Sequence, residues 1–184
     1  MTDIIKKAQK TDAYEIAKIH VAGWQGAYGG ILDQDFIESK SPEYRQQQWE
    51  NIFDEESGET LIYEKEGKPV GFISYGPLRT APPGTSKIRP LYSSEIYAVY
   101  LYPEYYRQGI GQALLKQAAF NLKAQKHHSL CLWVLDKNKR ACSFYEAMGG
   151  QRIGKMMVEF GPTKEKEVCY GWREIDVITS LNSD

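Results

Sequence analysis

The sequence is poor in the residues and patterns on which several classes of protein depend. Its 184 residues include three cysteines and three histidines, and the formal net charge is −1. No apolar run approaches the roughly 18 residues that a membrane-spanning helix needs, and the start of the chain lacks the apolar core of a signal peptide. The near-neutral charge argues against a general nucleic-acid or anionic-membrane surface. We therefore expect a cytoplasmic protein that binds neither nucleic acid nor a membrane.

The few cysteines and histidines are also spaced wrongly for a metal site or a disulfide framework. The cysteines are odd in number and form no Cys-x-x-Cys pair, so free thiols are expected. His127 and His128 are adjacent and cannot face the same way on a helix. No serine or cysteine is recognisably paired with a histidine, so neither a metal nor covalent catalysis is expected.

The most informative stretch is an extended apolar segment that leads into a glycine turn. Residues 96–102 are mostly β-branched, aromatic or aliphatic, as in a strand, and Pro103 ends the strand because it has no N–H to donate. Apolar residues at helical spacing from Leu114 onward predict a helix, so Gly109 and Gly111 lie at its start. There the first backbone N–H groups have no partner inside the helix, and glycine lets an anion approach them closely. This stretch predicts a pyrophosphate-binding turn.

Two other phosphate-binding motifs are absent. Leu114 occupies the place of the third glycine in a dinucleotide-binding fingerprint. The chain also has no Gly-x-x-x-x-Gly-Lys-Ser/Thr segment for a nucleoside triphosphate.

The order of strand, glycine turn and helix resembles motif A of the GCN5-related N-acetyltransferases. The family pattern is Arg or Gln, two variable residues, Gly, one variable residue, then Gly or Ala. Residues 106–111 match it except at Tyr106, where Arg or Gln is usual, and Arg107 can supply the missing charge. The resemblance implies that acetyl-CoA binds here. The residues it assigns to the cofactor are Val99, Leu101, Arg107, Gln108, Gly109, Ile110, Gly111, Gln112 and Ala113.

A second stretch resembles motif B of the same family. Residues 130–135 are expected to form a buried strand. The family's Asn, Ala, Phe-Tyr pair and closing Gly have counterparts at Asn138, Ala141, Phe144, Tyr145 and Gly149. Gly150 stands where an aromatic residue is usual. By this resemblance Asn138, Ala141 and Phe144 also contact acetyl-CoA.

The chain is expected to form one acetyltransferase domain over residues 1–176 and a frayed tail over residues 177–184. Its composition, 42% hydrophobic and 26% charged, is that of a globular protein. Outside the two motifs the sequence predicts a strand near Ile4, a helix capped by Thr11 and Asp12, a helix over residues 42–53, a hairpin over residues 60–76, a long loop over residues 77–91 and a closing hairpin after residue 150. The resemblance implies the GNAT fold, an α/β (α+β) arrangement in which a twisted, mixed and mostly antiparallel sheet of about seven strands is flanked by about four helices.

An aromatic, glycine-rich segment from Trp24 to Leu32 is expected to connect the first two helices. In the resembling fold this connection overhangs the acceptor pocket, so Trp24 and Tyr28 are candidate substrate-binding residues. The alternative is that both rings only pack on the core.

The resemblance implies direct transfer of the acetyl group to a primary amine. Glu95 would accept the amine proton through water, because a carboxyl with a pKa of about 4.3 is a poor direct base for an ammonium group with a pKa of about 10.4. A main-chain N–H near Val99 or Leu101 would stabilise the thioester oxygen. Tyr145 would donate a proton or hydrogen bond to the departing thiolate. The alternatives are a solvated carboxylate at Glu95 and a core side chain at Tyr145.

The sequence leaves the acceptor open. The options are a small-molecule amine, an N-terminal α-amine or lysine of a protein, and no acceptor at all in a CoA-binding sensor that has lost catalysis. The presence of both Glu95 and Tyr145 argues against the sensor. We expect an acyltransferase acting on a small-molecule amine, with a protein acceptor as the alternative. A homodimer is compatible with this fold, although the sequence does not reveal the symmetry.

Overall fold

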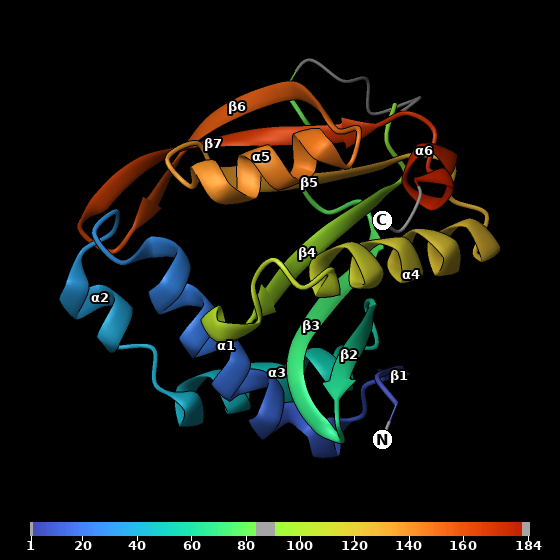
Figure 1. The fold of residues 1–184 in the computed structure, drawn as a ribbon. Coiled ribbons are helices and arrows are strands. Elements are labelled where there is room, and N and C mark those ends of the chain that lie inside the picture. Colours follow the sequence, from blue (N-terminus) through green and yellow to red (C-terminus); the bar gives the residue numbers. More distant parts are fainter. Residues whose placement is uncertain (1, 84–90, 182–184) are drawn as a thin grey trace. The chain divides into compact units, whose positions relative to one another are not determined.

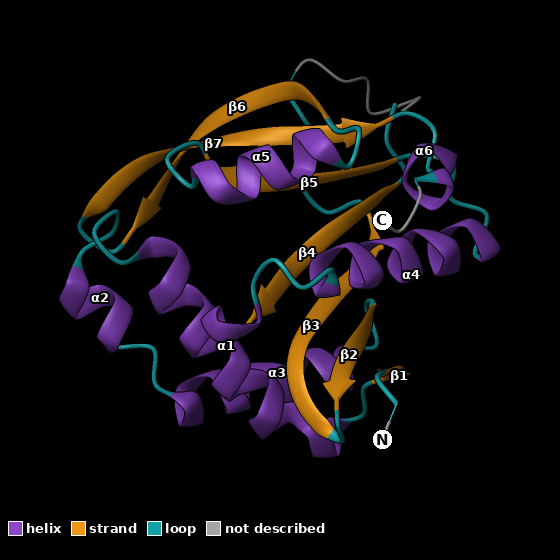
Figure 2. Ribbon diagram, in the orientation of Figure 1, coloured by secondary structure: helices purple, strands orange, loops and turns teal. Residues whose placement is uncertain are grey.

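The structure is a computed structural model that describes residues 2–83 and 91–181. Figures 1 and 2 show its helices and strands. In chain order the elements are β1 (Ile4–Lys7), the 3-10 helix η1 (Lys10–Asp12), α1 (Ala13–Tyr28), α2 (Gln34–Glu38), α3 (Pro42–Glu55), β2 (Glu59–Lys65), β3 (Lys68–Pro77), β4 (Ser94–Leu101), the 3-10 helix η2 (Pro103–Tyr105), α4 (Ile110–Ala124), β5 (Leu130–Leu135), α5 (Lys139–Ala147), β6 (Gln151–Phe160), β7 (Thr163–Trp172) and α6 (Asp176–Ser180).

The strands form one seven-stranded sheet in the order β1-β2-β3-β4-β5-β7-β6. β4 and β5 run parallel, whereas β1 and β2, β5 and β7, and β7 and β6 pair antiparallel. The expected mixed, helix-flanked α/β sheet is confirmed. Within the described ranges the helices are more numerous than expected, because short helices, α2 and α6, accompany the four longer ones.

By their contacts the residues group into two compact units. The first holds residues 1–74 and 98–114, and the second holds residues 75–97 and 115–184, apart from the positions that are not described. β3, β4 and α4 pass from one unit to the other.

In the first unit, α1 and α3 bury an apolar face together with side chains of β2 and β3. Ile16 and Ile19, which lie on one face of α1, are fully buried in this core. Gly23 lies on the same face, where α1 approaches β4 so closely that a Cβ on Gly23 would lie 2.8 Å from the Cβ of Tyr100. Glycine at this position therefore permits the close packing of helix and strand.

Both ends of α1 differ from the prediction. Asp12 ends η1 rather than capping α1 with its side chain, and its carboxylate accepts a hydrogen bond from the backbone N–H of Gln9 at 2.9 Å. Trp24 and Tyr28 lie in the last turns of α1, not in a connection. Gly26 lies inside this helix because the ring of Pro103 packs closely against it. A Cβ at Gly26 would lie only 2.9 Å from that ring, so glycine makes this packing possible.

In the second unit, the closing hairpin is longer than predicted, and β6 and β7 pair along most of their length. α5 begins at Asn138, whose side chain accepts a hydrogen bond from the N–H of Ala141, and Gly149 follows the helix with a φ of +82°. The tail was predicted to be frayed from residue 177. Instead, α6 extends to Ser180, and its residue Ile178 is buried. Of the long loop predicted over residues 77–91, residues 84–90 lie outside the described part of the chain.

Candidate functional site

The predicted phosphate turn lies at the start of α4, as expected. Gly109 has a φ of +77° and its carbonyl accepts the first helical hydrogen bond, from the N–H of Ala113 at 2.9 Å. Arg107 also has a positive φ, of +60°, which is uncommon for a residue with a Cβ. The N–H groups of Ile110, Gly111 and Gln112 belong to the first turn, where the helix itself offers them no acceptor. The turn can therefore bind an anion.

Gln108 and Arg107, the two long polar side chains of this turn, differ in whether the protein already supplies their hydrogen-bond partners. The amide of Gln108 accepts a hydrogen bond from Lys65 at 2.7 Å and donates one to the carbonyl of Glu104 at 3.0 Å. Arg107 is exposed and forms no hydrogen bond or ion pair with the described residues. Its charge remains available for an anion at the turn.

The strand residues expected to contact the thioester lie in β4. Val99 and Leu101 are both partly buried. β3 passes close to this end of β4, since a Cβ on Gly71 would lie 2.9 Å from Leu101 Cγ. The N–H of Tyr102, just beyond the strand, donates to the carbonyl of Val70 at 3.0 Å.

The two candidate acceptor residues are brought together at the end of α1. The rings of Trp24 and Tyr28 lie edge to face with centroids 5.3 Å apart. The indole N–H of Trp24 donates to the hydroxyl of Tyr100 at 3.0 Å, and the hydroxyls of Tyr28 and Tyr100 are 3.2 Å apart. All three residues are partly exposed, and Tyr100 also packs against the core of the first unit, so both alternatives for Trp24 and Tyr28 stay open.

Sequence analysis missed two residues of this aromatic region. His20 stacks on the ring of Tyr100 at 4.7 Å and accepts a hydrogen bond from the indole N–H of Trp49 at 3.2 Å. Burial and, to a smaller extent, the nearby charge of Arg45 lower the pKa of His20 to about 3, so His20 is neutral at physiological pH. Arg45 extends from α3 over the ring of Trp24, at 4.7 Å from its centroid. In the sequence, the one sign of this group was that His20 and Trp24 are four residues apart, which places them on the same face of a helix.

Glu95 lies at the second position of β4 and is buried, with 6% of its surface exposed. One carboxylate oxygen accepts hydrogen bonds from the backbone N–H groups of Arg79 and Thr80, at 2.9 and 2.7 Å. Burial raises the pKa of Glu95 above its usual value, although these two hydrogen bonds and the charge of Arg79 act in the opposite direction. The alternative of a solvated strand-end carboxylate is wrong.

Two further residues of the second unit face the same side of the sheet as Glu95. These residues are Trp133 and Glu167. Glu95 pairs with Cys131, and Trp133 lies two residues further along β5, so it points to the same side. Leu135 follows on that side, and Glu167 of β7 pairs with it. The indole N–H of Trp133 donates to the carbonyl of Thr80 at 3.0 Å. Burial raises the pKa of Glu167, and the charge of Glu95 raises it further. Neither residue belongs to a motif that sequence analysis could recognise.

The motif B residues lie around α5. Asn138 is buried and its side-chain oxygen caps the helix at the N–H of Ala141, 3.2 Å away. Tyr145 is also buried, with 6% of its surface exposed, and its ring lies 5.3 Å from Phe144 and 5.8 Å from Tyr170 between centroids. The packing fixes the ring of Tyr145, which suits both a core side chain and a positioned proton donor.

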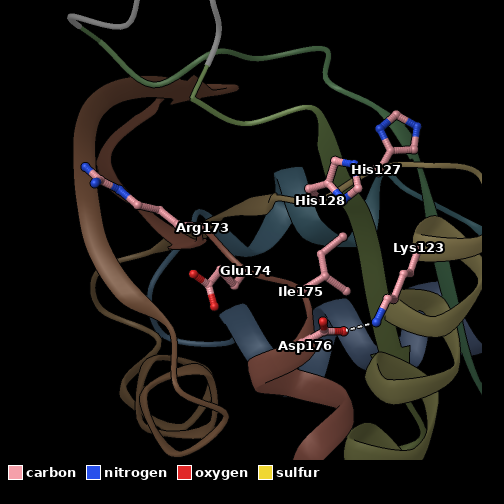
Figure 3. A pocket seen from close by; sticks show the side chains of 7 residues that line it. All are labelled: Lys123, His127, His128, Arg173, Glu174, Ile175 and Asp176. Atoms are coloured by element: carbon pink, nitrogen blue, oxygen red, sulfur yellow. Dashed lines mark hydrogen bonds and ion pairs between the residues drawn. The ribbon is translucent and has the colours of Figure 1, made fainter.

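A surface pocket of the second unit lies apart from all the predicted site residues of that unit. Figure 3 shows its lining residues, which are Lys123, His127, His128, Arg173, Glu174, Ile175 and Asp176. Lys123 and Asp176 point toward each other and form an ion pair at 2.5 Å. Because its cations are accompanied by carboxylates, the pocket presents no strong charge of one sign.

Three general features of the described residues complete the description. Cys131, Cys142 and Cys169 are free and buried. No helix within residues 2–83 and 91–181 is long and apolar enough to cross a membrane. Across the same described ranges, no group of three or more His, Cys, Asp or Glu residues is arranged to hold a metal ion.

Comparison with known proteins gives one consistent family. Residues 25–150 match the acetyltransferase (GNAT) family. The chain is 30% identical over 177 residues to YuaI, an uncharacterized N-acetyltransferase of Bacillus subtilis, and the match covers 96% of each chain. It is 38% identical over 94 residues to the thialysine N-epsilon-acetyltransferase of Bos taurus, which covers 50% of this chain and 53% of that one.

Solved structures agree on the fold. The PaiA N-acetyltransferase of Thermoplasma acidophilum, crystallised in complex with coenzyme A, is similar to this chain with a TM-score of 0.69. The two chains are 21% identical, and the match covers 94% of this chain and 100% of that one.

Proposed function

The chain belongs to the acetyltransferase (GNAT) family and is an N-acetyltransferase with acetyl-CoA as co-substrate, and we propose that its acceptor is the primary amine of a small molecule. The proposal places the pyrophosphate at the turn before α4. It assigns the acceptor to the aromatic residues at the end of α1, and the proton transfers to Glu95 and Tyr145.

The observation that carries the cofactor assignment is the geometry of Gly109. A Cβ at this position would meet no atom of the described residues within 4 Å, so the space in front of the turn is open. The positive φ of Gly109 lets the chain turn directly into the helix start, where backbone N–H groups that the helix does not pair favour an anion. The exposed guanidinium of Arg107 adds a positive charge on the same turn. A pyrophosphate fits this combination.

Acetyl-CoA, when bound, supplies the acetyl group as a thioester. Glu95 is suited to accept the proton of the acceptor amine through a water molecule, because its carboxylate is fixed by two backbone donors and its pKa is raised. Tyr145 is suited to donate a proton or hydrogen bond to the sulfur that leaves. A backbone N–H near Val99 or Leu101 would stabilise the negative charge on the carbonyl oxygen.

The preference for a small acceptor rests on two observations. One relative is named for acetylating thialysine, which is a small amine. In addition, Trp24, Tyr28 and Tyr100 form a compact aromatic group whose hydroxyls and indole N–H are linked by hydrogen bonds. Such a group offers a small molecule both apolar contact and polar recognition.

A thiol-release assay tests the proposal. The protein is incubated with acetyl-CoA and, separately, with diamines, amino sugars, amino acids and short peptides that carry a free α-amine or lysine. We expect amine-dependent release of CoA with at least one small molecule and much slower release with the peptides. Faster release with peptides would favour a protein acceptor, and acetyl-CoA binding without any release would favour a sensor. A cytoplasmic location and a homodimer remain predictions.

A further inference from the structure

Arg45 lies in the aromatic region of the first unit with most of its hydrogen-bonding capacity unused. Its guanidinium is stacked on Trp24, and one terminal nitrogen donates to the side-chain oxygen of Gln48 at 2.9 Å. The Nε–H is buried and has no acceptor among the described residues. An arginine carries five N–H donors, and a buried donor without an acceptor is costly. Arg45 is thus arranged to receive an acceptor group that the described chain does not supply.

The charge of Arg45 is also uncompensated. It forms no ion pair with any carboxylate of the described residues. Burial lowers the pKa of Arg45, and the nearby hydroxyls of Tyr100, Tyr44 and Tyr28 act in the opposite direction. His20, which lies beside it, is neutral at physiological pH because burial and the charge of Arg45 lower its pKa to about 3. Arg45 therefore contributes a positive charge to this region, and Lys40, over the rings of Phe36 and Tyr44, is a second cation nearby.

The position of the guanidinium is fixed from several sides. Trp24 supports one face of the plane, and Trp24 is itself held by its hydrogen bond to Tyr100. The side chain as a whole is partly exposed, whereas its Nε–H is buried, so a solute meets the exposed part of the guanidinium first. A planar fork held in this way is suited to bind a carboxylate through two parallel hydrogen bonds.

We propose that Arg45 binds a carboxylate of the acceptor, so that the acceptor is an amino acid or a related amino carboxylate. The inference rests on the proposed function, because it takes Trp24 and Tyr28 as part of the acceptor site. It goes further by naming the chemical class of the acceptor and a residue that selects it.

Matched acceptors test the inference. Each pair consists of an amino acid and the amine that remains after removal of its carboxylate, for example lysine and 1,5-diaminopentane. For the best pair we expect kcat/KM to favour the amino carboxylate by about 10- to 100-fold, which is the range for a hydrogen bond to a charged group. In Arg45→Met this preference should fall to about one, while the KM for acetyl-CoA stays unchanged. Arg45→Lys should retain part of the preference, because it keeps the charge and loses the fork.

A matched control separates recognition from general charge effects. Lys40 lies over the rings of Phe36 and Tyr44 at 4.7 and 4.8 Å and is a second cation in this part of the first unit. Lys40→Met should leave the preference for the carboxylate intact. Loss of the preference in Lys40→Met to the same degree as in Arg45→Met would overturn the inference. Thermal melting of each variant establishes that it is folded.

A binding measurement gives a second readout that does not depend on turnover. The Nε–H signal of Arg45, assigned in an NMR spectrum with the Arg45→Lys variant, is followed while acetate and the common amino acids are added. We expect a downfield shift with at least one amino acid. If none of them shifts this signal, the inference is wrong.

The outcomes also distinguish the inference from the proposed function. Equal acetylation of amines with and without a carboxylate, unaffected by Arg45→Met, would overturn the inference and leave the small-molecule acceptor in place. Acetylation of peptides alone would overturn both.

Discussion

The aromatic region of the first unit and the Glu95 region of the second unit hold charges of opposite sign, and they hold them differently. Glu95 is a buried carboxylate with two backbone N–H donors on one of its oxygens. Arg45 is a partly buried cation with one hydrogen bond and a buried Nε–H that lacks an acceptor. The protein itself satisfies the anion, whereas it leaves the cation for a ligand. A carboxylate held in place by the backbone, such as Glu95, is suited to proton transfer, whereas a cation with an unsatisfied donor, such as Arg45, is suited to binding a ligand.

The largest effect is expected on the affinity for acetyl-CoA, which we propose to bind at the glycine turn of the first unit. Gly111→Asp places a negative charge in the first turn of α4, where the helix favours an anion from the ligand instead. We expect calorimetry to show that binding of acetyl-CoA is abolished. Phe120→Asp is the control, because Phe120 lies on α4 with 62% of its surface exposed. Wild-type affinity in Gly111→Asp would mean that the pyrophosphate binds elsewhere.

The next effect concerns Tyr145, which the second unit holds among aromatic rings. Tyr145→Phe keeps the ring and removes only the hydroxyl. If the hydroxyl assists the leaving thiolate, kcat and kcat/KM should fall together by about 10²- to 10⁴-fold, while the affinity for acetyl-CoA is spared. Steady-state kinetics and calorimetry measure the two quantities. A loss of less than about tenfold would leave Tyr145 with a packing role only.

A pH-dependent effect is expected for Glu95. Glu95 can accept a proton only when ionised, and burial raises its pKa, so the wild-type rate should begin to fall at a higher pH than for an ordinary glutamate. Glu95→Gln retains an oxygen for the N–H groups of Arg79 and Thr80. Relative to the wild type, this variant should lose most rate at pH values above the pKa of Glu95 but well below that of the acceptor amine, and regain part of it as the pH approaches the pKa of the amine. The pH profiles of both proteins measure this ratio, and a constant ratio would remove Glu95 from the mechanism.

The smallest effect is expected at Trp24, which supports Arg45 and contributes apolar contact. Trp24→Ala should raise the acceptor KM by about tenfold through the loss of both. Trp24→Phe should raise it less, because a ring remains below the guanidinium. An unchanged acceptor KM in Trp24→Ala would place the acceptor site elsewhere.

The features that sequence analysis predicted best are local ones. Gly109 before α4, Asn138 between β5 and α5, and Gly149 after α5 each depend on a few neighbouring residues, and the structure has all three at the element ends that the motifs predicted. The cap that Asn138 forms on α5 was not predicted, and its contact with acetyl-CoA stays a prediction. The termination of α1 at Trp24 was wrong, because a glycine-rich segment indicates a break unless a close neighbour requires the glycines. That neighbour is Tyr100 for Gly23 and Pro103 for Gly26, both distant in the sequence.

The features that sequence analysis missed depend on contacts between distant segments. The role of Arg45 depends on Trp24, which lies on another helix, and the burial of Glu95 depends on the backbone of residues 79 and 80. No motif encodes such a contact. A charged residue becomes a candidate for recognition only when the structure shows which of its donors or acceptors lack a partner.

The most direct test of the central claim is a competition experiment read by mass spectrometry. The protein and acetyl-CoA are incubated with an equimolar mixture of small amines, amino acids and short peptides, and every acetylated product is identified. We predict that the dominant product is a small molecule acetylated on a primary amine. A peptide as the dominant acetylated product, or release of CoA without any acetylated amine, would contradict the account.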